Sequence, residues 1–383
     1  MGIVALAHKR DREPPTAPAS AKEAIVHDLG IDDIADLVLG AEVLGSGGGG
    51  DSHVPWRMLV GTLAEYGPVR LINADELPAD APLLPVLAGG PPGALAETFF
   101  NGHEFGRLRE TVEQQIGQPC AAVLPVQLGA FNTMIPLIAA ARLGLPCIDA
   151  DIMRRCFPAV EMTLFMLAGI RPSPVFMVDM WGMGTMFATQ RDDVVSTLIR
   201  TSLPHLGMVA LISTYTVTAE DCARFGARRA LTDCASIGRL LRSTSSHDLA
   251  SYGDFLRYCS GRVEFSGIVI DLVRDWREGT PHGTITLEAV EGPARLMRLE
   301  HQHENLVAAV DGELVVTVPD VIALIDVESG VVMQSADVVE GQRLLVIAIP
   351  TDARWHTPAG LELVGPQAFG LDVTPTRVGG SGG

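Results

Sequence analysis

Apolar residues recur with a helical period from about residue 32 to residue 260, and short apolar runs bounded by Gly and Pro alternate with them. Helices layered on a largely buried sheet produce this alternation, because a helix buries one stripe whereas a central strand is buried on both faces. The predicted helices, several opening on an Asp or Asn suited to an N-cap, are Asp33–Leu44, Pro55–Tyr66, Glu104–Ile116, Asn132–Leu143, Asp192–Leu203 and Asp233–Arg242. The predicted strands are Leu83–Ala88, Ala121–Val126, Val175–Asp179 and Met208–Thr214.

The pattern changes near residue 260 to short β-rich runs separated by turn signals such as Asp311-Gly312. Regular short strands with such turns are typical of a β-sandwich or a small barrel. We therefore predict an α/β domain with a layered sheet over residues 26–260 and a β-rich domain over residues 261–378, flanked by tails at 1–25 and 379–383. The predicted strands of the second domain are Val263–Leu272, Gly283–Leu287, Ala294–Leu299, Leu314–Val318 and Arg343–Ile349.

Length, composition and charge agree with two globular domains and exclude several roles. The chain has 383 residues, 47% of them hydrophobic and 19% charged, and this length exceeds what one core usually holds. Its formal net charge of −18 repels nucleic-acid phosphates and anionic membrane surfaces. No apolar run is long enough to span a membrane. The six scattered cysteines are typical of reduced thiols, so we expect a cytoplasmic protein.

The glycine-rich segment at residues 45–50 is the most unusual feature of the sequence. Five glycines in six residues cost conformational entropy unless the backbone bends sharply or approaches a ligand. The preceding segment is helical, whereas a dinucleotide-binding fingerprint follows a strand, so we discount a nucleotide site. Backbone N–H groups of Gly47, Gly48, Gly49 and Gly50, with Asp51, would instead hold an anionic or carbonyl oxygen. The alternative is a plain turn between two helices.

Two carboxylates, Asp149 and Asp151, follow a short apolar strand that begins at Cys147. Ligands bind at such strand ends in open α/β sheets, and residues two apart in an extended segment share a face. The pair is therefore predicted to share a divalent ion or to divide acid and base roles. Alternatively, Arg154 and Arg155 simply neutralise these charges.

His301 and His303 have the spacing of metal ligands on one face of a strand. Two ligands are too few to define a zinc site, and an exposed strand face explains the pattern equally. Possible metal ligands are thus the two histidines together with the two aspartates. The thiols Cys147 and Cys156 are interpreted as small core residues rather than nucleophiles.

Eight segments stand out together, at residues 44–51, 132–136, 139–146, 149–151, 155–158, 304–306, 318–322 and 360–370. In this order they resemble the S-methyl thiohydantoin desulfurase family, over most of the chain. The chain departs from the family pattern at Ser52-His53, Arg154, Cys156 and His303. The resemblance implies an α/β domain followed by a β-rich domain, and chemistry on a five-membered ring such as a hydantoin or thiohydantoin.

The leading hypothesis is a hydrolase that adds water to C2 of a 2-thiohydantoin or S-alkyl thiohydantoin and releases sulfide or thiol. Asp149 or Asp151 would act as base or metal ligand, Arg155 would balance anionic charge, and His53 would protonate the departing sulfur. We expect zinc as the metal, because the leaving group is soft. Further expected substrate-binding residues, in a cleft between the domains, are Asn132, Glu304 and Asn305.

Two other functions stay open at this point. One is a hydantoin or lactam ring hydrolase, or the partner subunit of a hydantoinase-like protein. The other is a non-catalytic accessory protein that binds a cyclic ligand. In each case we expect a small cyclic ligand and a homo-oligomer, with no nucleic-acid or membrane partner.

Overall fold

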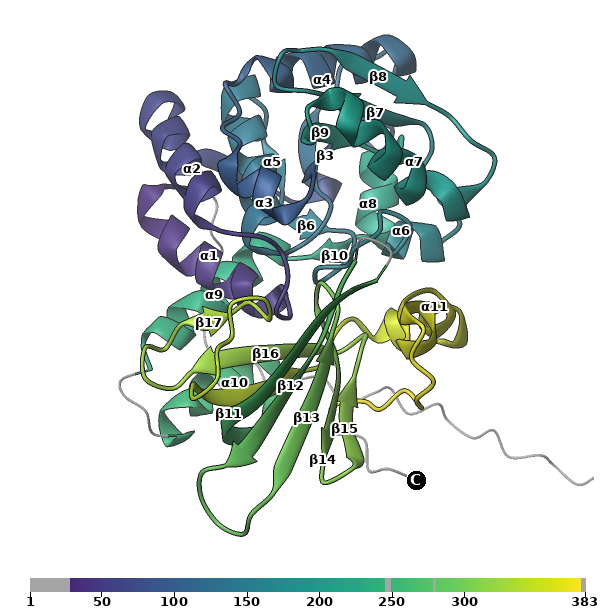
Figure 1. The fold of residues 1–383 in the computed structure, drawn as a ribbon. Coiled ribbons are helices and arrows are strands. Elements are labelled where there is room, and N and C mark those ends of the chain that lie inside the picture. The colour runs from purple at the N-terminus through teal and green to yellow at the C-terminus, as the bar shows by residue number, and fades with distance from the viewer. Residues whose placement is uncertain (1–27, 245–248, 278–279, 380–383) are drawn as a thin grey trace, which may run out of the picture.

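The computed structural model describes residues 28–244, 249–277 and 280–379, and shows two sheets joined by helices (Figure 1). The predicted tail at 1–25, and 380–383 of the predicted C-terminal tail, lie outside the described residues. The N-terminal part is α/β and the C-terminal part is an eight-stranded antiparallel sheet, which confirms the predicted fold class. No helix in the described part of the chain is long and apolar enough to cross a membrane.

The first sheet is mixed, with the strand order β1-β2-β5-β4-β3-β9-β7-β8. Strands β2, β5, β4 and β3 run parallel, and antiparallel strands extend the sheet on both sides. A separate pair, β6 and β10, lies beside it. The strand bounds are β1 Asp28–Leu29, β2 Val69–Ile72, β3 Leu83–Gly89, β4 Ala122–Pro125, β5 Cys147–Ile148, β6 Ala150–Asp151, β7 Val175–Val178, β8 Gly184–Phe187, β9 Ala210–Ser213 and β10 Ala227–Arg228.

Helices cover both faces of this sheet, because its central strands are apolar on both sides. In β3, Leu84 and Val86 face the core that contains α1, α2 and α5, whereas Leu83 and Leu87 face the core that contains α6 and α7. The helix bounds are α1 Ile34–Leu44, α2 His53–Tyr66, α3 Pro92–Glu97, α4 His103–Ile116, α5 Ala130–Leu143, α6 Leu164–Leu167, α7 Val195–Ser202, α8 Ala219–Phe225, α9 Ala230–Arg242, α10 Gly253–Cys259 and α11 Pro358–Val364.

The second sheet has the strand order β15-β14-β13-β12-β11-β18-β16-β17 and curls into a barrel-like shape. Strands β14 and β16 stand far apart in this order, yet Val318 N, between β15 and β16, donates to Leu306 O of β14 over 2.7 Å. Asn305 Nδ2 likewise donates to Ile322 O over 2.8 Å. The bounds are β11 Arg262–Arg277, β12 Thr280–Ala289, β13 Leu296–His301, β14 Asn305–Val310, β15 Glu313–Thr317, β16 Val321–Asp326, β17 Val332–Met333 and β18 Arg343–Ile349.

The two parts share one apolar core. Alternate residues of β16, Val321, Ala323 and Ile325, pack with α1 and α9, and the intervening residues fill the inside of the curled sheet. Helices α1 and α9 pack at glycines: a Cβ at Gly40 would lie 1.9 Å from the Cys234 carbonyl oxygen. The end of α1 is thereby held against the second sheet.

Candidate active site

The glycine loop after α1 lies at the junction of the two sheets. Its carbonyl groups accept hydrogen bonds from both sides: Asn305 N donates to Ser46 O over 2.7 Å, and Ser335 N donates to Gly47 O over 2.9 Å. From the first part of the chain, Phe131 N of α5 donates to Gly49 O over 2.9 Å. The loop is therefore more than a turn between two helices, because it connects three distant segments.

Close backbone approach explains why these positions are glycine. Gly47 and Gly49 have φ of +81° and +96°, where a side chain is strained. A Cβ at Gly47 would lie 2.4 Å from Asn305 Nδ2, and one at Gly49 would lie 2.9 Å from Gly129 Cα. Within the described residues the N–H groups of Gly49, Gly50 and Asp51 have no hydrogen-bond partner. These N–H groups therefore remain available to a ligand oxygen or nitrogen.

Glu304 lies against this loop with an unsatisfied carboxylate. It belongs to the turn between β13 and β14, and its side chain is only 2% exposed. A Cβ at Gly48 would lie 3.0 Å from Glu304 Oε1, and among the described residues Oε2 has no hydrogen-bond partner. Burial raises the pKa of Glu304 to about 7, although the positive charge of Arg155 opposes this shift. A carboxyl group of this kind exchanges protons near neutral pH.

Arg155 is fully buried beside Glu304. Its Nη1 donates to Pro319 O over 2.8 Å and to Asp320 O over 2.7 Å, and its guanidinium carbon lies 4.8 Å from the Phe157 ring centroid. Its Nη2 has no hydrogen-bond partner within the described part of the chain. The side chain is therefore fixed in orientation while one donor stays unused next to an acidic group.

Cys156 completes this cluster. Its thiol lies within hydrogen-bonding reach of the Glu304 carboxylate and is 4% exposed. On the opposite side, a Cβ at Gly129 would lie 3.6 Å from Cys156 Sγ, so the thiol lies next to the residue that precedes α5. Burial, followed by the charge of Glu304, raises the pKa of the Cys156 thiol well above its usual value.

A buried Asp–His pair supports the loop that holds Arg155. Asp320 Oδ1 accepts hydrogen bonds from His356 Nε2 over 2.8 Å and from Thr351 N over 3.0 Å, and its Oδ2 accepts one from Val378 N over 2.8 Å. The sequence analysis missed His356, because it lies 36 residues from its partner. Only the Val318-Pro319-Asp320 segment, which contributes to the family resemblance, indicated this region.

Asp149, which the sequence analysis predicted as catalytic, stabilises the N-terminus of α9. Its Oδ1 accepts hydrogen bonds from Leu231 N over 2.8 Å and Thr232 N over 3.1 Å, and its Oδ2 accepts one from Thr232 Oγ1 over 2.5 Å. Both carboxylate oxygens are thus engaged in a helix cap. Any role in catalysis would compete with these bonds.

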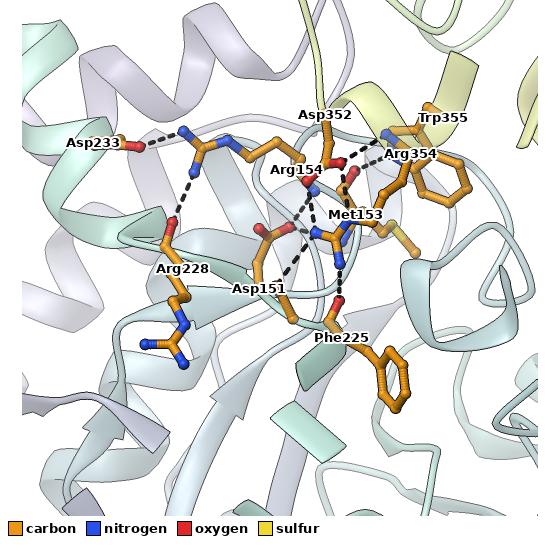
Figure 2. A network of polar contacts seen from close by, with 10 residues as sticks. Asp151, Met153, Arg154, Phe225, Arg228, Asp233, Asp352, Arg354 and Trp355 are labelled. Carbon is orange, nitrogen blue, oxygen red and sulfur yellow. Dashed lines mark hydrogen bonds and ion pairs between the residues drawn. The ribbon is translucent and has the colours of Figure 1, made fainter. Parts of the chain in front are cut away.

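Asp151 lies in a different network, which links the two parts of the chain (Figure 2). Its Oδ2 accepts hydrogen bonds from Met153 N over 2.9 Å and Arg154 N over 2.6 Å, while Oδ1 has no partner among the described residues. Burial raises the pKa of Asp151 to about 7. In the same network, Arg154 pairs with Asp233, and Arg354 pairs with Asp352 and with the Phe225 carbonyl (Figure 2).

Three other predicted residues have structural partners or face solvent. Asn132 uses its side chain to bind both backbone groups of Ala88, at 2.7 Å and 3.1 Å. Asn305 donates to Ile322 O and accepts a 2.6 Å hydrogen bond from Ser335 Oγ. His53 is exposed at the first residue of α2. Of the residues predicted to form the site, the structure brings together the glycine loop, Arg155, Glu304 and Asn305.

The two histidines do not share a strand face, so that prediction is wrong. Strand β13 ends at His301, and His303 belongs to the turn that leads into β14. The bulge where His301 pairs with Asn305 ends the regular alternation. No group of three or more His, Cys, Asp or Glu side chains in the described ranges is arranged to hold a metal ion. The zinc hypothesis stays a prediction.

Family models identify the chain along nearly its whole length. The S-Me-THD-like N-terminal domain matches residues 32–189, and the S-Me-THD-like C-terminal domain matches residues 190–378. The chain belongs to the S-methyl thiohydantoin desulfurase family. The name of this family implies an enzyme of the thiohydantoin desulfurase type.

A solved structure shows the same fold. The chain is similar to a protein from Chromobacterium violaceum whose X-ray crystal structure has been determined, with 24% sequence identity and a TM-score of 0.78. The similarity covers 92% of this chain and 99% of the other. No curated protein sequence matches the chain. At this level of identity the comparison establishes the fold alone.

Segments that carry the family resemblance meet at the cluster just described. The glycine loop contacts Glu304 and Asn305, and Arg155 binds the carbonyl groups of Pro319 and Asp320. The contacting segments lie far apart along the sequence: Ser46 and Asn305 are separated by 259 residues, and Arg155 and Pro319 by 164. We therefore take the cluster of Gly48, Gly49, Arg155, Cys156 and Glu304, hereafter the Glu304 cluster, as the candidate active site.

Proposed function

We propose that this member of the family hydrolyses an S-alkyl thiohydantoin to a hydantoin and a thiol, with Glu304 as the general base. The observation that carries this proposal is the buried Glu304 carboxylate, whose Oε1 lies against the glycine loop and whose Oε2 has no partner among the described residues, as is also true of Nη2 of the nearby Arg155. Buried polar atoms normally have partners, and exceptions concentrate where a ligand or reactant supplies them.

The reaction begins with a proton transfer to Glu304. Its ionised carboxylate accepts a proton from water as that water adds to C2 of the ring, and a pKa of about 7 makes this form abundant at neutral pH. Addition places negative charge on the ring nitrogen next to C2. Collapse of the tetrahedral intermediate then expels the sulfur substituent and forms the C2 carbonyl group.

The other groups of the cluster stabilise charge. The N–H groups of Gly49 and Gly50, which have no partner among the described residues, belong to a loop held by hydrogen bonds, so they bind developing negative charge without reorganisation. Arg155 keeps its charge next to Glu304 and has one free donor. Its two bonds to backbone carbonyl groups fix the position of the guanidinium group.

The function is tested by incubating the purified protein separately with an S-methyl thiohydantoin, a 2-thiohydantoin and a hydantoin. Released thiol or sulfide is measured with a thiol reagent, and hydantoin and ring-opened acid are separated by chromatography. We expect equal amounts of methanethiol and hydantoin from the S-methyl substrate. Ring-opened acid from hydantoin would instead support a ring hydrolase, and no turnover with ligand binding would support an accessory role.

Two variants assign any activity to the cluster. Glu304→Gln removes the base while preserving shape, and we expect turnover to fall at least about a hundredfold. The control is Glu161→Gln, because Glu161 is also buried but both its oxygens are bound by Ser196. Equal turnover in the Glu304→Gln variant and the wild type would contradict the proposal.

A further inference from the structure

Departure of an alkyl thiolate is assisted by an acid, because an alkyl thiolate binds its proton at least as tightly as the cysteine thiolate, whose pKa in water is about 8.5. His53 does not fit this role in the structure, because it is exposed at the first residue of α2 and has no described contact with the Glu304 cluster. Within the Glu304 cluster the donor must therefore be another group. The arginine is too weak an acid to donate a proton.

Cys156 is placed for this task. Its thiol lies between the Glu304 carboxylate and Gly129, next to the glycine loop, so a ring bound at the loop N–H groups would contact both side chains. A second buried group points to a ligand at this position. Glu304 is 2% exposed, and one of its carboxylate oxygens has no partner among the described residues. Among the described residues, Glu304 is the one side chain within hydrogen-bonding reach of the thiol, and its carboxylate is the acceptor.

We propose that Cys156 is the general acid that protonates the departing sulfur, and that Glu304 then returns the proton it took from water to Cys156. This inference rests on the proposed desulfurisation. It adds a catalytic residue at a position where the chain departs from its family pattern.

The step balances without any other reactant. Water gives one proton to Glu304 and its oxygen to C2. The C2–S bond breaks, its electron pair stays on sulfur, and the Cys156 proton is transferred to that sulfur to form the free thiol. The protonated Glu304 reprotonates the Cys156 thiolate, and the remaining hydroxyl proton moves from the oxygen on C2 to the adjacent ring nitrogen, which gives the C2 carbonyl and the N–H group of the hydantoin. Burial of Cys156 suits this role, because it keeps the thiol protonated until the leaving group develops charge.

The test varies the acidity of the leaving thiol. Wild type and Cys156→Ala are compared on two S-substituted thiohydantoins, one with an S-methyl group and one with an S-(4-nitrophenyl) group. The 4-nitrophenyl thiolate is stable enough to leave without protonation. We expect Cys156→Ala to lose about a hundredfold in kcat on the S-methyl substrate and less than about threefold on the S-aryl substrate. Cys156→Ser should resemble the alanine variant, because a hydroxyl group is a much weaker acid.

Two controls separate the possible failures. Cys120→Ala removes another buried thiol, two residues before β4 and outside the Glu304 cluster, and should leave both substrates unaffected. Glu304→Gln should impair both substrates, because water must still be activated. Equal losses on the two substrates, or no loss on either, would overturn the role of Cys156. If the wild type releases thiol from neither substrate, the proposed function itself fails.

Discussion

Two buried acidic regions lie close to the junction of the sheets, yet they differ in how their carboxylates are satisfied. Asp149 accepts three hydrogen bonds from the first turn of α9. Glu304 has one oxygen with no partner among the described residues, although it is buried at least as deeply. Asp151 is intermediate, with one oxygen bound twice and one unbound.

This difference separates a structural carboxylate from a reactive one. A carboxylate that accepts several N–H bonds is stabilised in its ionised form and contributes to folding. An unpaired buried carboxylate costs stability, and such a cost is retained mainly where function requires it. The comparison therefore favours the Glu304 cluster over the aspartate pair as the centre of the chemistry.

The largest expected effect contrasts Glu304 with Asp151, since both carboxyl groups have a pKa of about 7. Only Glu304 adjoins the glycine loop. We expect Glu304→Gln to lower kcat at least about a hundredfold, and Asp151→Asn to lower it by less than about fivefold. Steady-state thiol release measures both. A larger loss of kcat in Asp151→Asn would indicate that Asp151 takes part in catalysis.

The second largest expected effect is a loss of stability when the glycine loop is changed. An alanine at Gly47 meets Asn305 Nδ2 at 2.4 Å and adopts a strained φ of +81°, so we expect unfolding to become easier by about 3 kcal/mol. Gly61→Ala, in the middle of α2 with nothing within 4 Å, is the control and should be neutral or slightly stabilising. Denaturant titration measures both variants. If Gly47→Ala were as stable as wild type, the loop would have room for a side chain at this position.

Asp149→Asn tests whether Asp149 contributes to stability and not to turnover. The amide that replaces one oxygen cannot accept from the α9 N-terminus or from Thr232 Oγ1, so stability should fall by about 1–2 kcal/mol. Turnover per folded molecule should stay within about threefold of wild type. Thermal unfolding and activity at low temperature distinguish the two effects, and a normal stability with lost turnover would reverse our assignment.

The smallest effect is a pH dependence of stability. The folded state holds the Glu304 proton up to a pKa of about 7, whereas the usual value is 4.5. Stability from this group is therefore lost as pH rises from about 4.5 to about 7. Glu304→Gln lacks this loss, so its Tm relative to wild type should increase by a few degrees across that range. A Tm difference between the two proteins that stays constant with pH would indicate an ordinary pKa for Glu304.

Over the same pH range wild-type activity should rise, because the ionised form of Glu304 is the active base.

The periodicity of the chain was enough to predict most elements, because helix and strand periods depend on local sequence. Each of the six predicted helices and nine predicted strands coincides with an observed helix or strand. Strands β14 and β16 were missed, since both are apolar on nearly every residue and lack the alternation that indicates a half-buried strand. Their double burial becomes clear only from the closed sheet and from α1 packed on its outer face.

The sequence by itself determined the two-part architecture, the unusual glycine loop and the family resemblance, because these depend on local composition and order. It also indicated Arg155 and Glu304, but as minor members of a site centred on Asp149 and Asp151. Tertiary structure decided which carboxylate stays unsatisfied. Helix α9 supplies N–H donors to Asp149, whereas curling of the second sheet buries Glu304 against glycines that have no side chains to offer it. Hydrogen-bond satisfaction depends on partners far apart along the chain, and no local pattern encodes it.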